Sequence, residues 1–318
     1  MPIQVAVLDD YQEVARELGP WETLEPDAEV TYFHDHLLRD GVVRDLLAGF
    51  EVIVAMRERT PFSAERLATL PDLRLLVTTG MANAAIDMDA ARERGITVCG
   101  TGSLPSPTAE LAWGLIIALQ RNLVDEDRRM REGGWQRTIG PELAGRTLGI
   151  LGLGNLGRRM AAIARAFEMD VIAWSENLTA EAAAEAGATA VGRDELFERS
   201  DVLTIHTRLS DRTRGLVGAR ELALMKPTAL LVNTSRGPIV DEDALLAALR
   251  KGTIAGAALD VYAKEPLPKD SELREAPRTL LTPHLGYVSS GTYEVMYRDA
   301  VEDVAAWMRG KPVRVLNG

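Results

Sequence analysis

The chain has 318 residues, which predicts two domains at roughly 100–200 residues each. Apolar residues make up 46% and charged residues 26%, values that exclude a disordered or collagen-like chain. Lys plus Arg number 36 against 47 Asp plus Glu, and the formal net charge of −11 argues against a general binder of nucleic acids or anionic membranes.

Cysteine and histidine usage indicates the compartment. Cys99 is the only cysteine, so the chain can form no internal disulfide and no thiolate-rich metal site. The histidines lack zinc-ligand spacing, and we expect no metal. The N-terminus does not read as a signal peptide, and the longest apolar stretch, Leu111–Leu119, is too short to cross a bilayer. These features predict a protein of the reducing cytoplasm.

In the first hundred residues, short β-branched segments alternate with segments that have apolar residues at helical spacing. This alternation predicts a parallel sheet covered by helices. The predicted strands are Ile3–Leu8, Val30–Phe33, Glu51–Ala55, Leu73–Thr78 and Ile96–Cys99. The predicted helices are Tyr11–Leu18, Arg39–Leu47, Ser63–Leu70 and Asp87–Arg94.

The alternation stops at Thr101–Pro107, a segment rich in Pro, Gly and Ser that indicates a passage between domains. Thr108 is predicted to cap the N-terminus of a long apolar helix, Ala109–Arg121. A polar segment follows and ends at Gly133-Gly134-Trp135.

The alternation then resumes and continues to the C-terminal region. The predicted strands are Thr147–Leu151, Val171–Trp174, Ala188–Val191, Val202–His206, Ala229–Asn233, Ala255–Val261 and Thr279–Thr282. The predicted helices are Leu156–Phe167, Ala180–Ala186, Asp194–Arg199, Asp241–Lys251 and Gly291–Arg309, the last returning to the first domain. The sequence therefore predicts an α/β chain of two doubly wound parallel-sheet domains. Residues 104–286 form a dinucleotide-binding domain inserted into a substrate-binding domain of residues 1–103 and 287–318.

A GxGxxG sequence, GLGNLG at 152–157, lies directly between the predicted strand Thr147–Leu151 and a predicted helix. An ordinary tight turn is the alternative, because glycines at this spacing arise by chance in a chain with 27 of them. The strand–turn–helix setting favours a dinucleotide site.

Each residue of this turn has a physical role in such a site. Gly152 permits the tight turn, and Gly154 lets the pyrophosphate approach the backbone. Gly157 lets the helix and the strand pack closely. The free N–H groups that open the helix, at Asn155 and Leu156, hold the phosphates.

The end of the second strand of this domain indicates which dinucleotide binds. A carboxylate that binds the adenine ribose is expected there, about 20 residues after the glycines. Ser175 occupies that place, and Glu176 follows one position later. Because no Arg or Lys lies in Ser175–Ala184 and Glu176 would repel a 2′-phosphate, NAD is favoured. NADP is not excluded, since a serine can bind either the 2′-hydroxyl of NAD or the 2′-phosphate of NADP.

Three further segments carry motifs: LLVNTSRGPIVDEDALLAAL (230–249), AGAALDVYAKEPLP (255–268) and TLLTPHLGYVSSGT (279–292). Together with the glycine motif, they resemble the NAD(P)-dependent D-2-hydroxyacid dehydrogenase family. The resemblance extends from about Glu51 to the C-terminus and is densest from Gly145 to Gly286.

The resemblance implies a catalytic set of Arg236, Glu265 and His284. The planar guanidinium of Arg236 suits the carboxylate of a 2-keto acid, which it can bind bidentately. His284 can donate a proton to the carbonyl oxygen as hydride arrives, and Glu265 can hold the other ring nitrogen and favour the charged imidazole. The alternative is that these are a surface cation and a structural histidine. His34, His36 and His206 are not expected to be the acid.

The resemblance also suggests further contacts with the cofactor. Thr207 and Arg208 follow a strand where family members line the cofactor, and the backbone and hydroxyl of Thr234 could meet the nicotinamide. Asp260 is placed to accept a hydrogen bond from the carboxamide. The alternative for Asp260 is a buried carboxylate that caps a loop.

The substrate's other contacts are expected in the first domain. Arg57 resembles the family's substrate-contacting basic position, whereas Arg59 could be a solvated neighbour. The loop that includes Gly80 and Met81 resembles the loop whose backbone N–H groups meet the substrate's carboxylate. Its continuation, Asn83-Ala84-Ala85-Ile86-Asp87, departs from the family's usual Asp-Asn-Ile-Asp.

These observations predict reversible hydride transfer between NAD(H) and a D-2-hydroxyacid or its 2-keto acid, in a cleft between the two domains. One alternative is a formate or phosphite dehydrogenase of the same family. Another is a nucleotide-sensing corepressor that resembles the C-terminal-binding proteins. The resemblance implies a homodimer, to which the apolar helix containing Leu111–Leu119 is expected to contribute.

Overall fold

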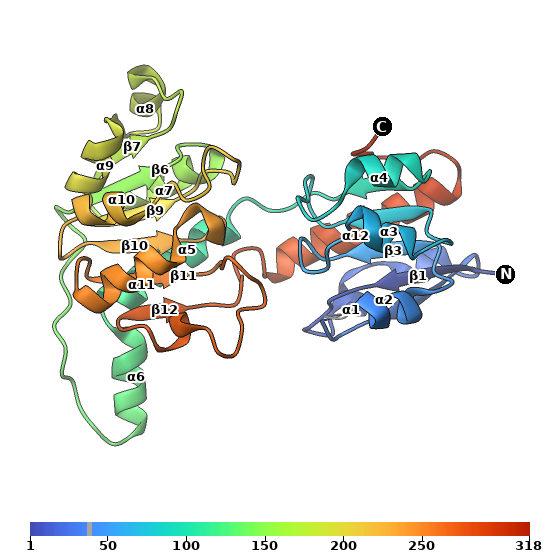
Figure 1. Cartoon of the computed structure of the whole chain (residues 1–318), viewed down its shortest axis with the longest axis horizontal. Helices are drawn as coiled ribbons and strands as arrows, with labels where there is room; N and C mark the ends of the chain where they lie inside the picture. Colours follow the sequence, from blue (N-terminus) through green and yellow to red (C-terminus); the bar gives the residue numbers. More distant parts are fainter. Residues whose placement is uncertain (37–39) are drawn as a thin grey trace. The chain divides into compact units, whose positions relative to one another are not determined.

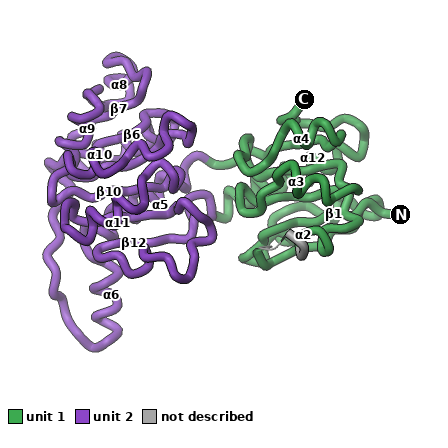
Figure 2. The backbone as a smooth tube through the Cα atoms, in the orientation of Figure 1, with its two compact units in different colours: residues 1–104, 289–318 green, residues 105–288 purple. Residues whose placement is uncertain are grey.

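The structure, a computed structural model, describes residues 1–36 and 40–318. The chain divides into two compact units, which we call unit 1 and unit 2 (Figure 2). Unit 1 consists of Met1–Leu104 and Ser289–Gly318, and unit 2 of Pro105–Val288. Arg39, the first residue of one predicted helix, lies outside the described residues.

Unit 1 contains a five-stranded parallel sheet in the order β2-β1-β3-β4-β5 (Figure 1). Its strands are β1 (Ile3–Val7), β2 (Ala28–Tyr32), β3 (Val52–Ala55), β4 (Leu75–Thr78) and β5 (Thr97–Gly100). Every residue of β3 and β4 is buried, as expected for central parallel strands with helices on both faces.

The helices of unit 1 come from both ends of the chain. They are α1 (Ala15–Leu18), α2 (Asp40–Leu47), α3 (Ala64–Ala68), α4 (Met88–Glu93) and α12 (Ser290–Met308), with a 3₁₀ turn at Trp21–Leu24. Helix α1 begins at Ala15, later than the predicted Tyr11. The Asp10 carboxylate accepts the N–H groups of Val14 and Ala15 and so fixes the start of the helix at this point.

Unit 2 contains a seven-stranded parallel sheet in the order β12-β11-β10-β9-β6-β7-β8. Its strands are β6 (Thr147–Leu151), β7 (Asp170–Trp174), β8 (Thr189–Ala190), β9 (Val202–Ile205), β10 (Leu230–Asn233), β11 (Gly256–Leu259) and β12 (Thr279–Leu281). The strand order reverses between β6 and β9. In doubly wound sheets, ligands bind outside the carboxyl ends of the strands at such a point.

Unit 2 contains two helices that were not predicted, α6 and α10. Its helices are α5 (Pro107–Gln120), α6 (Leu123–Arg131), α7 (Asn155–Ala166), α8 (Ala180–Glu185), α9 (Arg193–Arg199), α10 (Ala219–Leu224) and α11 (Glu242–Lys251), with 3₁₀ turns at Gly237–Ile239 and Glu272–Glu275. The predicted cap at Thr108 is wrong. Helix α5 starts at Pro107, two residues before the predicted Ala109, and the Thr108 hydroxyl donates to the Gly286 carbonyl at 2.8 Å.

The strands of unit 2 alternate their side chains between two apolar cores. Leu148 and Ile150 pack on the side of α5 and α7, and Leu203 and Leu231 pack in the other core, with residues of α9, α10 and α11. The predicted α/β fold with two parallel sheets is therefore confirmed. Within the described part of the chain, no helix combines the length and apolar character that crossing a bilayer requires.

Candidate active site

The glycine-rich turn after β6 is packed so tightly that two of its positions exclude a side chain. Gly152 has φ +103°, and a Cβ there would lie 2.7 Å from the Thr207 nitrogen. A Cβ on Gly157 would lie 2.3 Å from the Gly152 carbonyl oxygen. The turn therefore needs glycine at both positions, as the sequence motif predicts.

The N-terminus of α7 presents unused N–H groups. Gly154 occupies the cap position and supplies no side-chain acceptor, and the helical hydrogen bonds begin with the Arg158 N–H, which donates to the Gly154 carbonyl. The N–H groups of Asn155, Leu156 and Gly157 precede that bond and so have no acceptor within the helix. This end of α7 fits the pyrophosphate of a dinucleotide.

Ser175 and Glu176 follow β7 and line a cavity of about 430 Å³ together with Thr207. The Ser175 Oγ accepts the N–H of Leu153 at 2.9 Å, which ties the end of β7 to the glycine-rich turn. Glu176 is exposed. Both residues are therefore placed beside the glycine-rich turn, where the ribose was expected.

Thr207 and Thr234 follow β9 and β10, the strands on one side of β6. The Ser235 hydroxyl donates to the Thr207 carbonyl at 2.5 Å, so the two loops are joined. The Thr234 hydroxyl is buried and has no hydrogen-bond partner among the residues that the structure describes. A buried hydroxyl without a partner is costly unless a ligand satisfies it, so the residues present here fit a bound dinucleotide.

Arg236 lies on a loop that follows β10, and Asn233 at the end of that strand holds the loop in place. The buried Asn233 amide donates to the Arg236 carbonyl and accepts the Ser235 N–H, both at 3.0 Å. At Gly237, an added Cβ would lie 1.9 Å from the Tyr262 carbonyl carbon. This close approach of two backbones holds the Arg236 loop beside the loop that carries Glu265.

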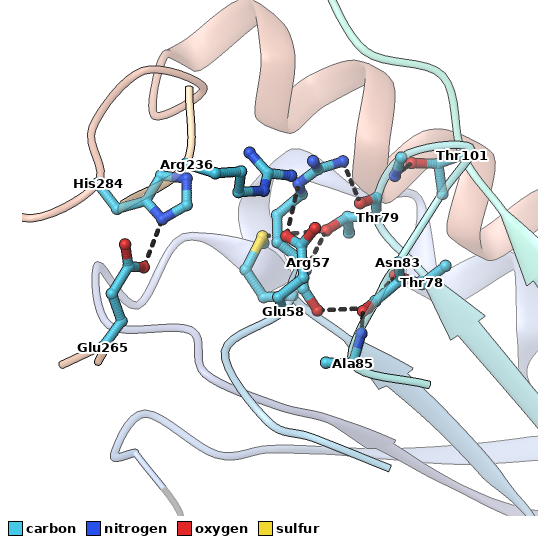
Figure 3. A network of polar contacts seen from close by, with 12 residues as sticks. Arg57, Glu58, Thr78, Thr79, Asn83, Ala85, Thr101, Arg236, Glu265 and His284 are labelled. Atoms are coloured by element: carbon cyan, nitrogen blue, oxygen red, sulfur yellow. Dashed lines mark hydrogen bonds and ion pairs between the residues drawn. The ribbon is translucent and has the colours of Figure 1, made fainter. Parts of the chain in front are cut away.

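His284 and Glu265 form a hydrogen-bonded pair. The His284 Nδ1 lies 2.6 Å from the Glu265 Oε2 (Figure 3). The other carboxylate oxygen of Glu265 accepts the Tyr262 N–H at 2.9 Å, so this carboxylate is fixed in place. His284 has φ +56°, a backbone conformation that non-glycine residues rarely adopt and that clusters at functional sites. Its side chain is 22% exposed and so accessible to a ligand.

Asp260 orders the loop on which His284 lies. It is fully buried and accepts three hydrogen bonds, from the Thr282 hydroxyl at 2.6 Å, the Leu285 N–H at 2.7 Å and the Gly286 N–H at 2.8 Å. Burial raises the pKa of its carboxyl group. These contacts are those of a buried carboxylate that caps a loop, and the expected bond to a carboxamide stays a prediction.

The other three histidines are engaged elsewhere. Burial lowers the pKa of His206 to about 3, so this side chain is neutral at physiological pH, and its Nε2 lies 2.8 Å from the Thr204 hydroxyl. In unit 1, His34 contacts the Asp10 carbonyl and His36 contacts the Asp9 carboxylate, each through Nδ1 at 3.1 Å. Of the four, only His284 is paired with a carboxylate at the carboxyl ends of the strands in the unit 2 sheet.

Arg57 is held by the loop that follows β4 (Figure 3). Its Nη1 donates to the Thr79 carbonyl at 3.1 Å, its backbone N–H donates to the Thr79 hydroxyl at 2.8 Å, and the Asn83 amide donates to its carbonyl at 2.6 Å. Gly80 has φ +101°, and a Cβ there would lie 1.9 Å from the Arg57 Nη1. Met81 is 54% exposed. The three predicted substrate residues are therefore neighbours.

One detail of that loop concerns its backbone. The Gly80 N–H donates to the Thr101 hydroxyl at 2.9 Å. Gly80 also makes room for the Arg57 guanidinium, because a Cβ at this position would lie against it. The expectation that backbone N–H groups of this loop meet the substrate's carboxylate stays a prediction.

Sequence reasoning missed the residues that order these loops, chiefly Asn83, Asn233 and Tyr262. The two asparagines each accept a backbone N–H two residues ahead, from Ala85 and Ser235, which is the contact of an Asx turn. For Asn233, its place at the end of the apolar strand β10 was the available signal. Tyr262 gave no such signal, because its hydroxyl contacts the distant Thr282 carbonyl.

Comparison with known proteins identifies the family of this chain. The family profile described as "D-isomer specific 2-hydroxyacid dehydrogenase, NAD binding domain" matches residues 113–286. The chain is 41% identical to a glyoxylate reductase of Aeropyrum pernix, over 98% of this chain and 89% of that protein. It is 35% identical to a glycerate dehydrogenase of Methylorubrum extorquens, over 83% of this chain and 85% of that protein.

A solved structure shows the same fold. A phosphoglycerate oxidoreductase from Vibrio cholerae superposes with a TM-score of 0.92 at 37% identity, covering 97% of this chain and 99% of that one. Both the profile and the full-length relatives thus match the chain whose loops are described above. The chain therefore belongs to the D-isomer specific 2-hydroxyacid dehydrogenase family and is an NAD-dependent oxidoreductase.

Proposed function

We propose that this protein reduces the small 2-keto acids glyoxylate and hydroxypyruvate with NADH, and catalyses the reverse oxidation of the D-2-hydroxyacid. The observation that carries the proposal is the 2.6 Å contact between His284 Nδ1 and Glu265 Oε2 at the edge of the dinucleotide sheet. The names of the relatives from Aeropyrum and Methylorubrum, glyoxylate reductase and glycerate dehydrogenase, support the choice of acids.

His284 is the proposed acid. Because Nδ1 donates to Glu265, the proton that is exchanged with the substrate is the one on Nε2. His284 passes this proton to the carbonyl oxygen of the keto acid and takes it back during oxidation. Bound NADH supplies the hydride that reaches the carbonyl carbon. Glu265 is a positioning residue that holds the ring through its contact with Nδ1.

Arg236 is proposed to hold the substrate. A guanidinium group presents two parallel N–H donors to a carboxylate and so fixes its plane. The same charge polarises the neighbouring carbonyl group toward attack. In unit 1, Arg57 is the proposed second cationic contact, in the orientation that Gly80 permits, and the exposed Met81 is the proposed apolar contact.

The test is NADH oxidation with a panel of keto acids: glyoxylate, hydroxypyruvate, pyruvate, phenylpyruvate and 2-ketoisocaproate. We expect kcat/KM for glyoxylate and hydroxypyruvate to exceed that for phenylpyruvate and 2-ketoisocaproate by at least about tenfold, the size of effect that misfit of a side chain produces in a pocket. Tight NADH binding without turnover of any acid would favour the nucleotide-sensing alternative.

The proposed compartment is the cytoplasm. Cys99 is the only cysteine and is fully buried, so the chain makes no internal disulfide, as is usual for proteins of a reducing compartment. The same NADH assay, applied to cell fractions, should find the activity in the cytoplasmic fraction.

We also propose a homodimer, formed through a segment different from the one expected. In helix α5, Ala112, Leu115 and Ile116 are buried in the core of unit 2, so they are not available to a partner. Helix α6 and the segment after it extend from the sheet of unit 2 (Figure 1). They carry five exposed large apolar side chains: Leu123, Val124, Met130, Trp135 and Ile139. A second copy of this chain is the proposed occupant of that surface, because the resemblance implies a dimer.

Sedimentation of the intact protein should give twice the mass of one chain. Ile139 is 98% exposed, and Ile139→Asp should place a charge in the interface and shift the protein to monomer at micromolar concentration. Leu46→Asp, a matched change of an exposed residue in unit 1, should remain dimeric. A wild-type monomer would contradict the proposal.

A further inference from the structure

The cavity at the ends of β7 and β9 is richer in positive charge than the sequence around Ser175 suggests. It has a volume of about 430 Å³. Its charged lining residues are Glu176, Arg193, Arg208 and Arg212, three cations against one carboxylate. The arginines come from the start of α9 and from the loop after β9, so none of them lies in the stretch that follows β7.

Two of the three arginines are available to a ligand. Arg193 is committed to the protein, since its Nη2 lies 2.9 Å from the Glu221 carboxylate and 3.0 Å from the Leu216 carbonyl. Arg208 and Arg212 are exposed, and their side chains make no hydrogen bond or ion pair with any residue in 1–36 or 40–318.

The loop that carries these two arginines is ordered although their side chains are not bound. The Thr213 hydroxyl donates to the Arg208 carbonyl at 2.7 Å and accepts the Ser210 N–H at 2.8 Å. These bonds close the loop on itself and hold Arg208 and Arg212 on the wall of the cavity. A cationic loop that is already ordered loses little conformational freedom when an anion binds.

Ser175 lines the same cavity. Its Oγ accepts the Leu153 N–H, which leaves the hydroxyl proton to be donated to a ligand. A carboxylate at this position would exclude a phosphate, and serine does not. Glu176 is exposed to solvent, where water and salt screen its repulsion of an anion.

We propose that this cavity also accepts a ribose 2′-phosphate, held by Arg208 and Arg212 with a hydrogen bond from Ser175, so that the enzyme binds NADP(H) as well as NAD(H). A guanidinium group matches the geometry of phosphate and keeps its charge at all accessible pH values. The sequence favours NAD because residues 175–184 contain no cation. The fold brings the cations in from positions 208 and 212 instead.

Calorimetry on the full-length protein tests the proposal with two probes that lack a nicotinamide, 2′,5′-ADP and 5′-AMP. The two differ by the 2′-phosphate alone. We expect wild-type protein to bind 2′,5′-ADP at least as tightly as 5′-AMP. A charge-assisted hydrogen bond corresponds to about a tenfold change in Kd. Arg212→Ala should therefore weaken 2′,5′-ADP about tenfold and change 5′-AMP less than about twofold, and Arg208→Ala should act in the same direction.

Arg214→Ala is the matched control, because Arg214 is an exposed arginine of the same segment that does not line the cavity. It should leave the Kd of both probes unchanged. The proposal is overturned if 2′,5′-ADP binds the wild type tenfold more weakly than 5′-AMP, or if the ratio of the two Kd values is the same in wild type and Arg212→Ala. Neither probe needs a keto acid, so this test is independent of the substrate proposed above.

Discussion

Replacing His284 by glutamine should lower kcat for keto acid reduction by about 10²–10⁴-fold, the range that a general acid contributes. A glutamine side chain can still donate a hydrogen bond to Glu265, so the loop keeps its polar contact. It cannot deliver a proton to the carbonyl oxygen, and the alkoxide that develops as hydride arrives is left without a proton. Steady-state assays with saturating NADH measure this loss.

The same variant should bind NADH with a Kd within about twofold of wild type, because the proposed phosphate and ribose contacts lie elsewhere in unit 2. Titration of NADH fluorescence measures that value. His34→Gln is the matched control: His34 lies in unit 1, where it contacts a backbone carbonyl, and this variant should keep full activity. If His284→Gln retained more than a third of wild-type kcat, another group would have to be the acid.

The dinucleotide half of the site could be predicted because its geometry is local. Gly152 and Gly157 lie five positions apart in the sequence, and the close contact between them arises within one strand–turn–helix unit. A pattern of residue types at fixed spacing therefore carries the whole of that geometry. The placement of Thr207 beside the turn could also be expected, since the ends of neighbouring parallel strands meet at one edge of the sheet.

Several supports of the catalytic loops could not be predicted, because they join residues far apart in the chain. Asp260 binds the backbone of Leu285 and Gly286, 25 and 26 residues away. Thr101 takes the N–H of Gly80 from 21 residues away. No periodicity or composition indicates such pairs, and the same is true of Arg212, which lines one cavity with Ser175 only after folding.

Helix α6 was missed for a different reason. Periodicity detects a helix through its buried apolar stripe, and α6 has no buried residue. Its helical form is supported instead by ion pairs one turn apart, Arg128 with Asp125 and Arg131 with Asp127, both at 2.8 Å. Pairs of this kind contribute only about 0.2–0.5 kcal/mol each, so their presence in a sequence is a weak predictor.

Replacing Arg236 by lysine should raise KM for glyoxylate by about 10²-fold, although the positive charge is kept. The ammonium group offers a point charge, whereas the guanidinium group binds both carboxylate oxygens in one plane. Loss of one charge-assisted hydrogen bond and of the fixed orientation corresponds to about 2–3 kcal/mol, which is 30- to 150-fold. Initial rates over a range of glyoxylate concentrations measure the change.

The structure adds a reason to expect that lysine cannot adapt at this position. Asn233 fixes the backbone of the Arg236 loop, and Gly237 lies in close contact with the Tyr262 carbonyl group. The loop is therefore held too firmly to move a shorter lysine side chain toward the substrate. Arg250→Lys, on the exposed surface of α11, is the matched control and should leave KM unchanged. Comparing pyruvate with its methyl ester isolates the interaction, because only the acid carries the carboxylate. The advantage of the acid over the ester should fall by about the same 10²-fold in Arg236→Lys, and an undiminished advantage would show that another group binds the carboxylate.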